Sequence, residues 1–209
     1  MTRRGVVCLL ALVSQWDHSG PTPRPFARES LTLESRTEFM SEESSQGDTG
    51  ANAAAAVSRI LQRLVAVNLF PTEYTGNPSV TGPGVPLSDL PADVDARLFA
   101  GANGKNFVRI HDSFSGKDHW YTQGAIEAAG IGERIGRLWG TAQWPAPIPP
   151  PPNLSGDRHV SAEGEVVPVP DHVKGMTFRL FRTPDGAGYV RMTDSAGRSV
   201  WLNAALIDS

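Results

Sequence analysis

The chain repeats one stretch of its own sequence, first in its middle and again near its end. RLFAGANGKNFVRIHD occupies residues 97–112 and RLFRTPDGAGYVRMTD occupies residues 179–194, an offset of 82 residues (179 − 97 = 82). One residue is dropped further along, after which Trp120 falls on Trp201 at an offset of 81 (201 − 120 = 81). A match of this length predicts two small units that share one architecture.

The two copies carry the same turn signal at the same place. Asn103-Gly104 and Asp185-Gly186 fall at equivalent positions between strand-like runs. Such pairs are the strongest short signals for a β-hairpin, because both central residues of a type I′ turn need positive φ. Each copy therefore predicts an antiparallel β-meander. We expect strands near residues 95–101, 106–112 and 118–126 in the first unit, and near 177–182, 188–194 and 199–207 in the second.

A further strand is expected to open each unit. The offset of 82 carries Val85-Pro86 onto Val167-Pro168. Proline cannot donate to a strand ladder, so this strand belongs at a sheet edge or at a bulge.

An alanine-rich segment before the first unit predicts a helix. Residues 51–69 read ANAAAAVSRILQRLVAVNL, and Pro71 stops the pattern. The apolar stripe is spaced 4, 3, 4 and 3 residues apart and consists of Ala53, Val57, Ile60, Leu64 and Val67. Two heptads fit either a helix packed on its own β domain, which we prefer, or an oligomerisation helix.

The segment between the units reads as a linker. Glycines interrupt EAAGIGERIGRLWG at residues 127–140, and five prolines within residues 147–152 favour an extended polyproline II arm. The expected fold is mainly β with an N-terminal helix and two barrel- or sandwich-like meander units. The predicted organisation is a disordered or leader segment at 1–48, the helix at 49–70, β units at 79–127 and 161–209, and the linker at 128–158.

The N-terminal residues give conflicting signals. MTRRGVVCLLALVSQ has the charge order of a secretory signal peptide, but its apolar run is short and lacks a convincing cleavage site. The run is also too short to span a bilayer. We rank a disordered leader, or a natural start at Met40, above a working signal peptide; the favoured locations are a virion or the extracellular space.

Composition excludes several classes of partner and site. The formal charge is −3 with no long run of one sign, which disfavours nucleic acid and anionic membranes as partners. Cys8 is the single cysteine, so an internal disulfide framework and a thiolate-rich metal site are excluded. No phosphate-binding glycine loop is present, and we expect no cofactor.

Aromatic and arginine side chains recur on one face of each unit. Strand alternation places Phe107 beside Arg109 and Tyr189 beside Arg191. These four, together with Trp120 and Trp201, are the candidate binding residues, because aromatic and arginine side chains dominate interface energetics and aromatic planes suit sugar rings. The competing interpretation, which we prefer, is a cation–π pair that covers the sheet.

One group of residues has the composition of a metal or catalytic site. His111, Asp112 and His119 supply two imidazoles and a carboxylate within nine residues. The repeat argues against this site, because the equivalents of the two histidines are Thr193 and Val200.

The leading hypothesis is a non-enzymatic structural or attachment protein, such as a decoration, fibre or tail protein of a phage particle, that forms a homo-oligomer or a larger assembly. Two alternatives stay open. One is a secreted module that binds carbohydrate or cell wall, and the other is a metal-dependent hydrolase that uses His111, Asp112 and His119.

Overall fold

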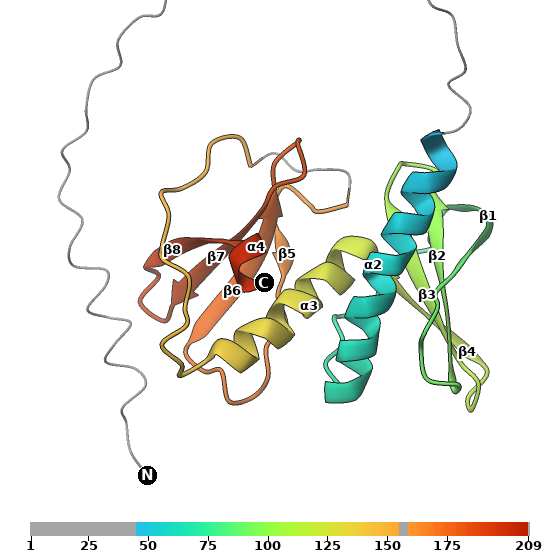
Figure 1. Cartoon of the computed structure of the whole chain (residues 1–209), viewed down its shortest axis with the longest axis horizontal. Coiled ribbons are helices and arrows are strands. Elements are labelled where there is room, and N and C mark those ends of the chain that lie inside the picture. The colour runs from blue at the N-terminus through green and yellow to red at the C-terminus, as the bar shows by residue number, and fades with distance from the viewer. Residues whose placement is uncertain (1–44, 155–158, 209) are drawn as a thin grey trace, which may run out of the picture. The chain divides into compact units, whose positions relative to one another are not determined.

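The computed structural model describes residues 45–154 and 159–208, with side chains from residue 50 onward (Figure 1). Most of the predicted leader therefore lies outside the described residues. The elements follow in the order α2 (Ser45–Val67), β1 (Val80–Pro86), β2 (Val94–Gly101), β3 (Asn106–Asp112), β4 (Lys117–Thr122), α3 (Gln123–Leu138), β5 (Glu165–Val166), β6 (Met176–Arg182), β7 (Gly188–Asp194), β8 (Ser199–Asn203) and α4 (Ala204–Ile207). Within these ranges, no helix has both the length and the apolar character needed to cross a bilayer.

Helix α2 packs on the first sheet of its own chain. It ends where Asn68 adopts a φ of 51° and the Leu69 amide donates to the Leu64 carbonyl at 3.1 Å. Val57, Leu61 and Leu64 are buried against the residues of β2 and β3 that point toward the helix. The interpretation of an amphipathic helix that serves its own domain is confirmed.

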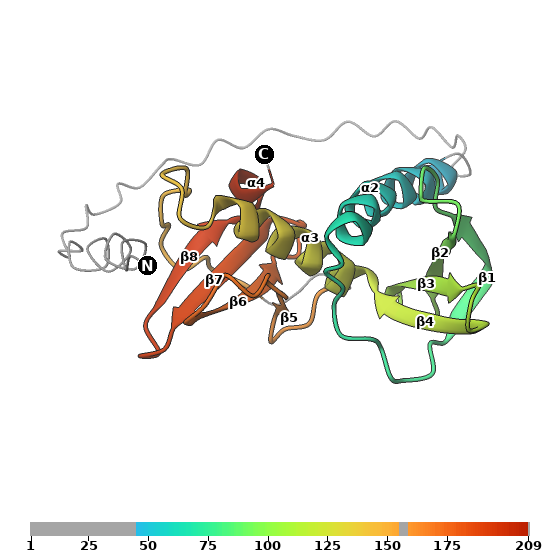
Figure 2. The same cartoon turned by 90° about the horizontal axis from the view of Figure 1, so that it is seen from below.

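The strands form two open antiparallel sheets of four strands each. The first has the order β1, β2, β3, β4 and the second the order β5, β6, β7, β8. The prediction of a mainly β fold with antiparallel meanders is confirmed, and neither sheet closes into a barrel. Helices α2 and α3 lie between the sheets, which therefore do not pack on each other (Figures 1 and 2).

The register of the central strands follows the sequence repeat, whereas the opening strands depart from it. Val85 pairs with Leu98, and Glu165 pairs with Leu180. The equivalent residues are thus 80 apart (165 − 85 = 80) rather than 82, so the Val-Pro match between the copies is not a structural match. The connection from β5 to β6 contains the two additional residues.

The hairpin loops differ from the predicted type I′ turn. Gly104 and Gly186 have φ values of 76° and 86°, but Asn103 and Asp185 do not have positive φ. In the first loop the Gly104 amide donates to the Gly101 carbonyl at 2.9 Å. Both loops are three residues long and place glycine in the left-handed position, which is the alternative hairpin geometry.

The predicted linker at 128–158 is wrong in its first part, because α3 occupies residues Gln123–Leu138. Its glycines lie where neighbouring chain comes closest. A Cβ on Gly130 would lie 2.8 Å from an Ile60 side-chain carbon, and one on Gly132 would overlap the Pro168 carbonyl oxygen. Glycine thus serves close packing of a buried helix rather than a break in it.

The proline-rich segment also differs from a free spacer. The Ile148 amide donates to the Trp201 carbonyl at 2.9 Å, which forms an isolated antiparallel bridge to β8. The segment therefore lies along the edge of the second sheet at this point.

Candidate binding faces

Each sheet has one side packed toward the helices and one side turned away from them. Leu98 and Val108 belong to the core around α2, so alternation turns Arg97 and Arg109 to the other side. We call this other side face A in the first sheet and face B in the second. Face A has the cross-strand rows Asp95, His111, Asp118; Arg97, Arg109, Trp120; and Phe99, Phe107, Thr122. Face B has the rows Thr177, Thr193, Ser199; Arg179, Arg191, Trp201; and Phe181, Tyr189, Asn203.

An arginine lies over aromatic rings at the centre of face A. The Arg109 guanidinium carbon lies 5.7 Å from the centroid of the Phe99 ring. The Phe99 ring is tilted against that of Trp120 with centroids 5.2 Å apart. Gly84 lies beneath Phe99, and a Cβ there would approach the ring to 2.7 Å.

Face B repeats this arrangement. The Arg191 guanidinium carbon lies 5.1 Å from the Phe181 centroid and 5.9 Å from that of Trp201. The Phe181 and Trp201 centroids are 5.2 Å apart, and Gly164 lies beneath Phe181 as Gly84 lies beneath Phe99. Cation–π contacts of this kind hold the arginine in one orientation over the sheet.

The structure brings together some of the predicted binding residues and separates others. Arg109 lies directly opposite Trp120, and Arg191 lies opposite Trp201. Phe107 instead packs against Tyr74, with ring centroids 5.2 Å apart. Tyr189 lies in the neighbouring row of face B.

Trp201, which contacts Arg191, was among the predicted binding residues, but two other aromatic side chains that contact the arginines were not. They are Phe99 and Phe181, the third residue of the repeated Arg-Leu-Phe triplet. The triplet was a usable signal, because alternation along it places its phenylalanine and its arginine on one face.

The faces differ in the row next to the arginines. In face A, Asp95 and Asp118 each place an oxygen 3.7 Å from an Arg109 guanidinium nitrogen. Asp118 also lies 2.7 Å from Nδ1 of His111. The corresponding row of face B contains only hydroxyl side chains, and no carboxylate among the described residues forms an ion pair with Arg191.

The predicted metal or catalytic group is not assembled. His111 lies in face A, whereas His119 lies on the opposite side of β4 and contacts Glu73 at 3.2 Å. The Asp112 carboxylate accepts hydrogen bonds from the Ser115 hydroxyl and the Phe114 amide, which lower its pKa. Within the described ranges, no three His, Cys, Asp or Glu side chains are arranged to hold a metal ion.

Phe114 projects from the turn that Asp112 holds. Its side chain is 99% exposed at the tip of the β3–β4 hairpin. The Phe114 amide donates to Asp112 at 2.9 Å, so the turn that presents the ring is fixed by local hydrogen bonds. The corresponding β7–β8 turn has Ala196 and no aromatic residue.

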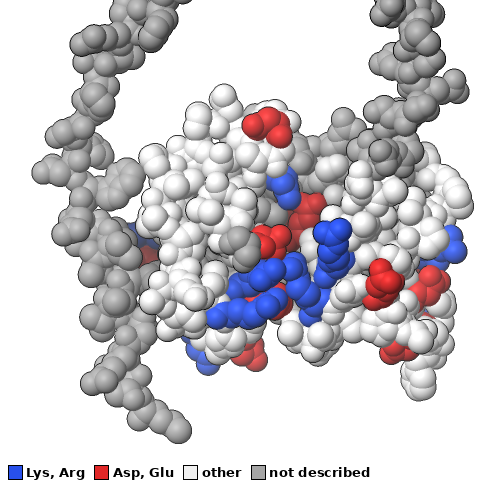
Figure 3. All heavy atoms as spheres, viewed as in Figure 1, with Lys and Arg blue, Asp and Glu red and all other residues white. Residues whose placement is uncertain are grey.

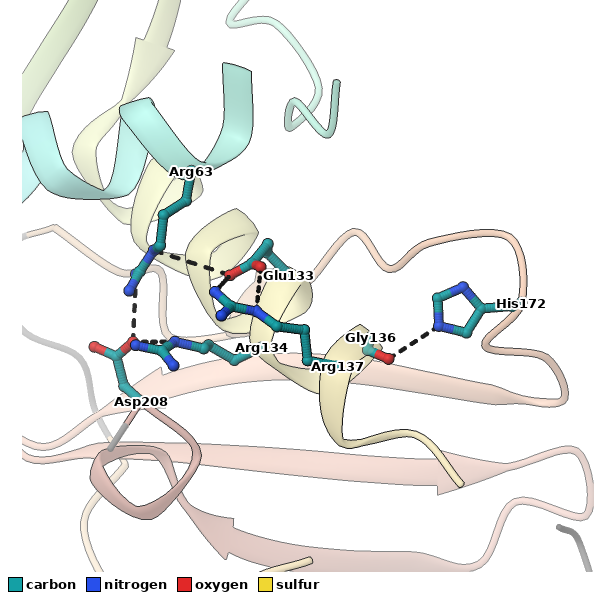
Figure 4. Close-up of polar contacts among 7 residues, drawn as sticks. All are labelled: Arg63, Glu133, Arg134, Gly136, Arg137, His172 and Asp208. Carbon is teal, nitrogen blue, oxygen red and sulfur yellow. Dashed lines mark hydrogen bonds and ion pairs between the residues drawn. The ribbon is translucent and has the colours of Figure 1, made fainter. Parts of the chain in front are cut away.

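A second charged cluster lies in the helix layer. Figure 3 shows basic and acidic side chains gathered on this side of the molecule, and Figure 4 shows how five of them lie. Glu133, 5% exposed, accepts from Arg137 at 2.5 and 2.7 Å and lies 3.9 Å from Arg63. Asp208 pairs with Arg63 at 3.4 Å and with Arg134 at 3.5 Å.

This cluster connects three helices. Arg63 comes from α2, Glu133 and both other arginines come from α3, and Asp208 follows α4. The i to i+4 spacing of Glu133 and Arg137 was visible in the sequence. The pairs to Arg63 and Asp208 depend on the tertiary fold, and their role is to hold the helices together.

The comparisons with known proteins give no relative from which a role for faces A and B could be inferred. No protein-family model matches the chain, and neither a curated protein nor a solved structure matches it.

Proposed function

We propose that this chain is a non-enzymatic assembly or attachment protein that makes its contacts through faces A and B. The observation that carries the proposal is the row of two arginines and a tryptophan that occurs on both faces. The work is of the kind that decoration, fibre and tail proteins of phage particles perform, and a virion or extracellular setting suits it.

The side chains of this row suit a contact surface. Arginine and tryptophan are enriched among the residues that contribute most to interface affinity. Arg109 and Arg191 are already ordered by their aromatic neighbours. Side chains that are ordered before binding lose less conformational entropy when a partner arrives, which favours association.

The principal acidic residues near the faces support a structural role rather than a chemical one. Asp112 and Asp194 accept hydrogen bonds within their turns, and Asp118 is engaged by Arg109 and His111. These contacts stabilise hairpins and one sheet face, which is consistent with a protein that binds and does not catalyse.

Face A is suited to another protein chain. Asp95 and Asp118 both pair with Arg109, and Arg97 donates to the Pro83 carbonyl at 3.2 Å, so the face has no net formal charge to desolvate in an interface. Phe114 extends from the same hairpin and would supply an apolar anchor. We infer that self-association, or attachment to a neighbouring protein, uses this side of the molecule.

Replacement of Phe114 by serine tests the assembly role. We expect the full chain to have a mass above 22.4 kDa in solution, and Phe114→Ser to reduce it toward 22.4 kDa, because the anchor is lost. The far-ultraviolet circular dichroism spectrum should not change, since the ring is 99% exposed in the single chain and contributes little to its core. Light scattering after size exclusion, over a series of concentrations, measures the mass.

Ala196→Ser at the equivalent turn is the matched control and should leave the mass unchanged. A wild-type chain that stays at 22.4 kDa at every concentration would remove self-assembly from the proposal. Equal masses for Phe114→Ser and wild type would show that an assembly exists but does not use this hairpin.

A further inference from the structure

We propose that face B binds a carboxylate-bearing polysaccharide, of the polyuronic acid type, with Arg191 as the residue that holds the carboxylate. The inference rests on the proposed attachment function and assigns a ligand class to one of its two faces. It follows from a charge difference between faces that otherwise match.

The charge difference lies in one row. Face A contains two arginines and two aspartates, whereas face B contains two arginines and no carboxylate. Thr177, Thr193 and Ser199 occupy the positions that Asp95, His111 and Asp118 occupy in face A. The formal charge is therefore zero on face A, with histidine neutral, and +2 on face B.

Arg191 is the accessible cation of face B. Arg179 is turned toward the β5 edge, where its Nη1 donates to the carbonyls of Glu163 and Gly164 at 3.1 and 3.0 Å. Arg191 is partly exposed, and the contacts described for its guanidinium are those with Phe181 and Trp201. A planar guanidinium held over rings can still donate through its edge, which matches the two oxygens of a carboxylate.

The surroundings of Arg191 favour a sugar polymer over an acidic peptide. The adjacent row presents three hydroxyl side chains, of which Thr193 and Ser199 are hydrogen-bonded to each other at 2.8 Å. Trp201, in the row of the arginine, and Tyr189, in the next row, are both partly exposed. Hydroxyl groups match sugar hydroxyls and aromatic planes match sugar rings, so one uronic acid unit would find all three kinds of partner within neighbouring rows.

The test measures binding of the full chain to polygalacturonate by isothermal titration calorimetry. We expect saturable binding at one face per chain, weakening as salt is raised. Arg191→Gln should lower the affinity roughly tenfold or more, because a charge-assisted hydrogen-bond pair is lost. Arg109→Gln is the matched control from face A and should change it less than about twofold.

The row of residues that differs between the faces can be exchanged in either direction, to add a polygalacturonate site to face A or to remove the site from face B. Asp95→Thr with Asp118→Ser removes the two carboxylates beside Arg109, and we expect this variant to bind polygalacturonate at a second site. Thr177→Asp with Ser199→Asp places carboxylates beside Arg191 and should abolish binding. The melting temperature of each variant reports that the fold is retained.

Three ligands distinguish a polysaccharide carboxylate from an uncharged sugar polymer and from an acidic peptide as the group that face B binds. Polygalacturonate should bind, its methyl ester should not, and poly-glutamate should bind much more weakly. Equal binding of the ester would overturn the role of the carboxylate, and equal binding of poly-glutamate would replace the polysaccharide with an acidic protein. Absence of polygalacturonate binding, while Phe114→Ser still lowers the mass, would overturn this inference and leave the assembly role standing.

Discussion

The packing of α3 requires glycine at position 132, because the side chain there can be no larger than a hydrogen atom. The helix passes so close to the Pro168 carbonyl that a methyl group at this position has no room. The same residue type at Gly50, in α2, has no atom within 4 Å of the equivalent position. The two glycines share a conformation but not an environment.

Alanine substitutions at these two positions should therefore act in opposite directions. Gly132→Ala overpacks a buried site and should lower the free energy of unfolding by about 1–3 kcal/mol or more. Gly50→Ala should raise it by about 0.5–1 kcal/mol, because alanine loses less backbone entropy in a helix. Urea denaturation of both variants measures the difference, and a Gly132→Ala protein as stable as wild type would contradict the close approach.

The glycines also explain why the sequence predicted a linker, and not a helix, over most of α3. Gly130, Gly132 and Gly136 lower intrinsic helix propensity, and propensity is what a single sequence displays. Tertiary packing of small residues against Ile60 and Pro168 more than offsets that penalty. This packing depends on residues far from α3 in the sequence, so the sequence of the segment itself does not reveal it.

At the level of elements, the hairpin turns depend on ionised aspartates. The pKa of Asp112 is lowered by hydrogen bonds from the Ser115 hydroxyl and the Phe114 amide, and that of Asp194 by hydrogen bonds from Arg198 and the Ala196 amide. The pKa of Asp185 is lowered by a hydrogen bond that its carboxylate accepts from the Thr183 side chain. Each carboxylate is therefore favoured in its charged form in the folded state.

These shifts give a defined pH dependence. A lowered folded-state pKa stabilises the fold above the unfolded value of about 3.9, and this contribution is lost as pH falls through the lower folded value. We expect the Asp112→Asn and Asp194→Asn double variant to be less stable than wild type at neutral pH, and the difference to shrink in acid. Urea midpoints across this pH range measure it.

Asp171→Asn serves as the control, because Asp171 is exposed and lies outside the two turns that Asp112 and Asp194 hold. A double variant whose deficit stays constant down to acid pH would show that the turns do not depend on the charge.

The pairing of strands was predictable because alternation and turn residues are local. Alternation along one strand predicts that Phe107 and Arg109 share a face, and the register places both in face A. The contrast between faces A and B was not predictable, since the neighbours of Arg191 come from β6, β7 and β8 and require the register of all three strands. The first residues of each unit misled the alignment because valine and proline recur at different structural positions.

At the level of the whole molecule, the helix layer connects the two sheets. α2 supplies part of the first core, α3 packs on α2 and contacts β5 and β6, and Glu133 and Asp208 pair with arginines across the helices. α3 contacts strands of both sheets, and α2 and α4 both pack on α3. The two halves should therefore unfold together.

Core substitutions in either sheet test this coupling. Leu98→Ala in the first sheet and Leu180→Ala in the second each remove a buried side chain and should cost about 2–5 kcal/mol. We expect one shared transition to move in both variants, whether followed by far-ultraviolet circular dichroism or by tryptophan fluorescence. Two separate transitions, with only one displaced, would show independent domains.

The packing of helices on one side of each sheet has a consequence for binding. The core of the first sheet faces α2, and Trp139 at the end of α3 packs against Phe178 of the second sheet, so each sheet leaves its other side to a partner. Faces A and B belong to separate sheets and share no residue. A partner on one face therefore does not occupy the other, and one chain offers two partners a different chemistry each.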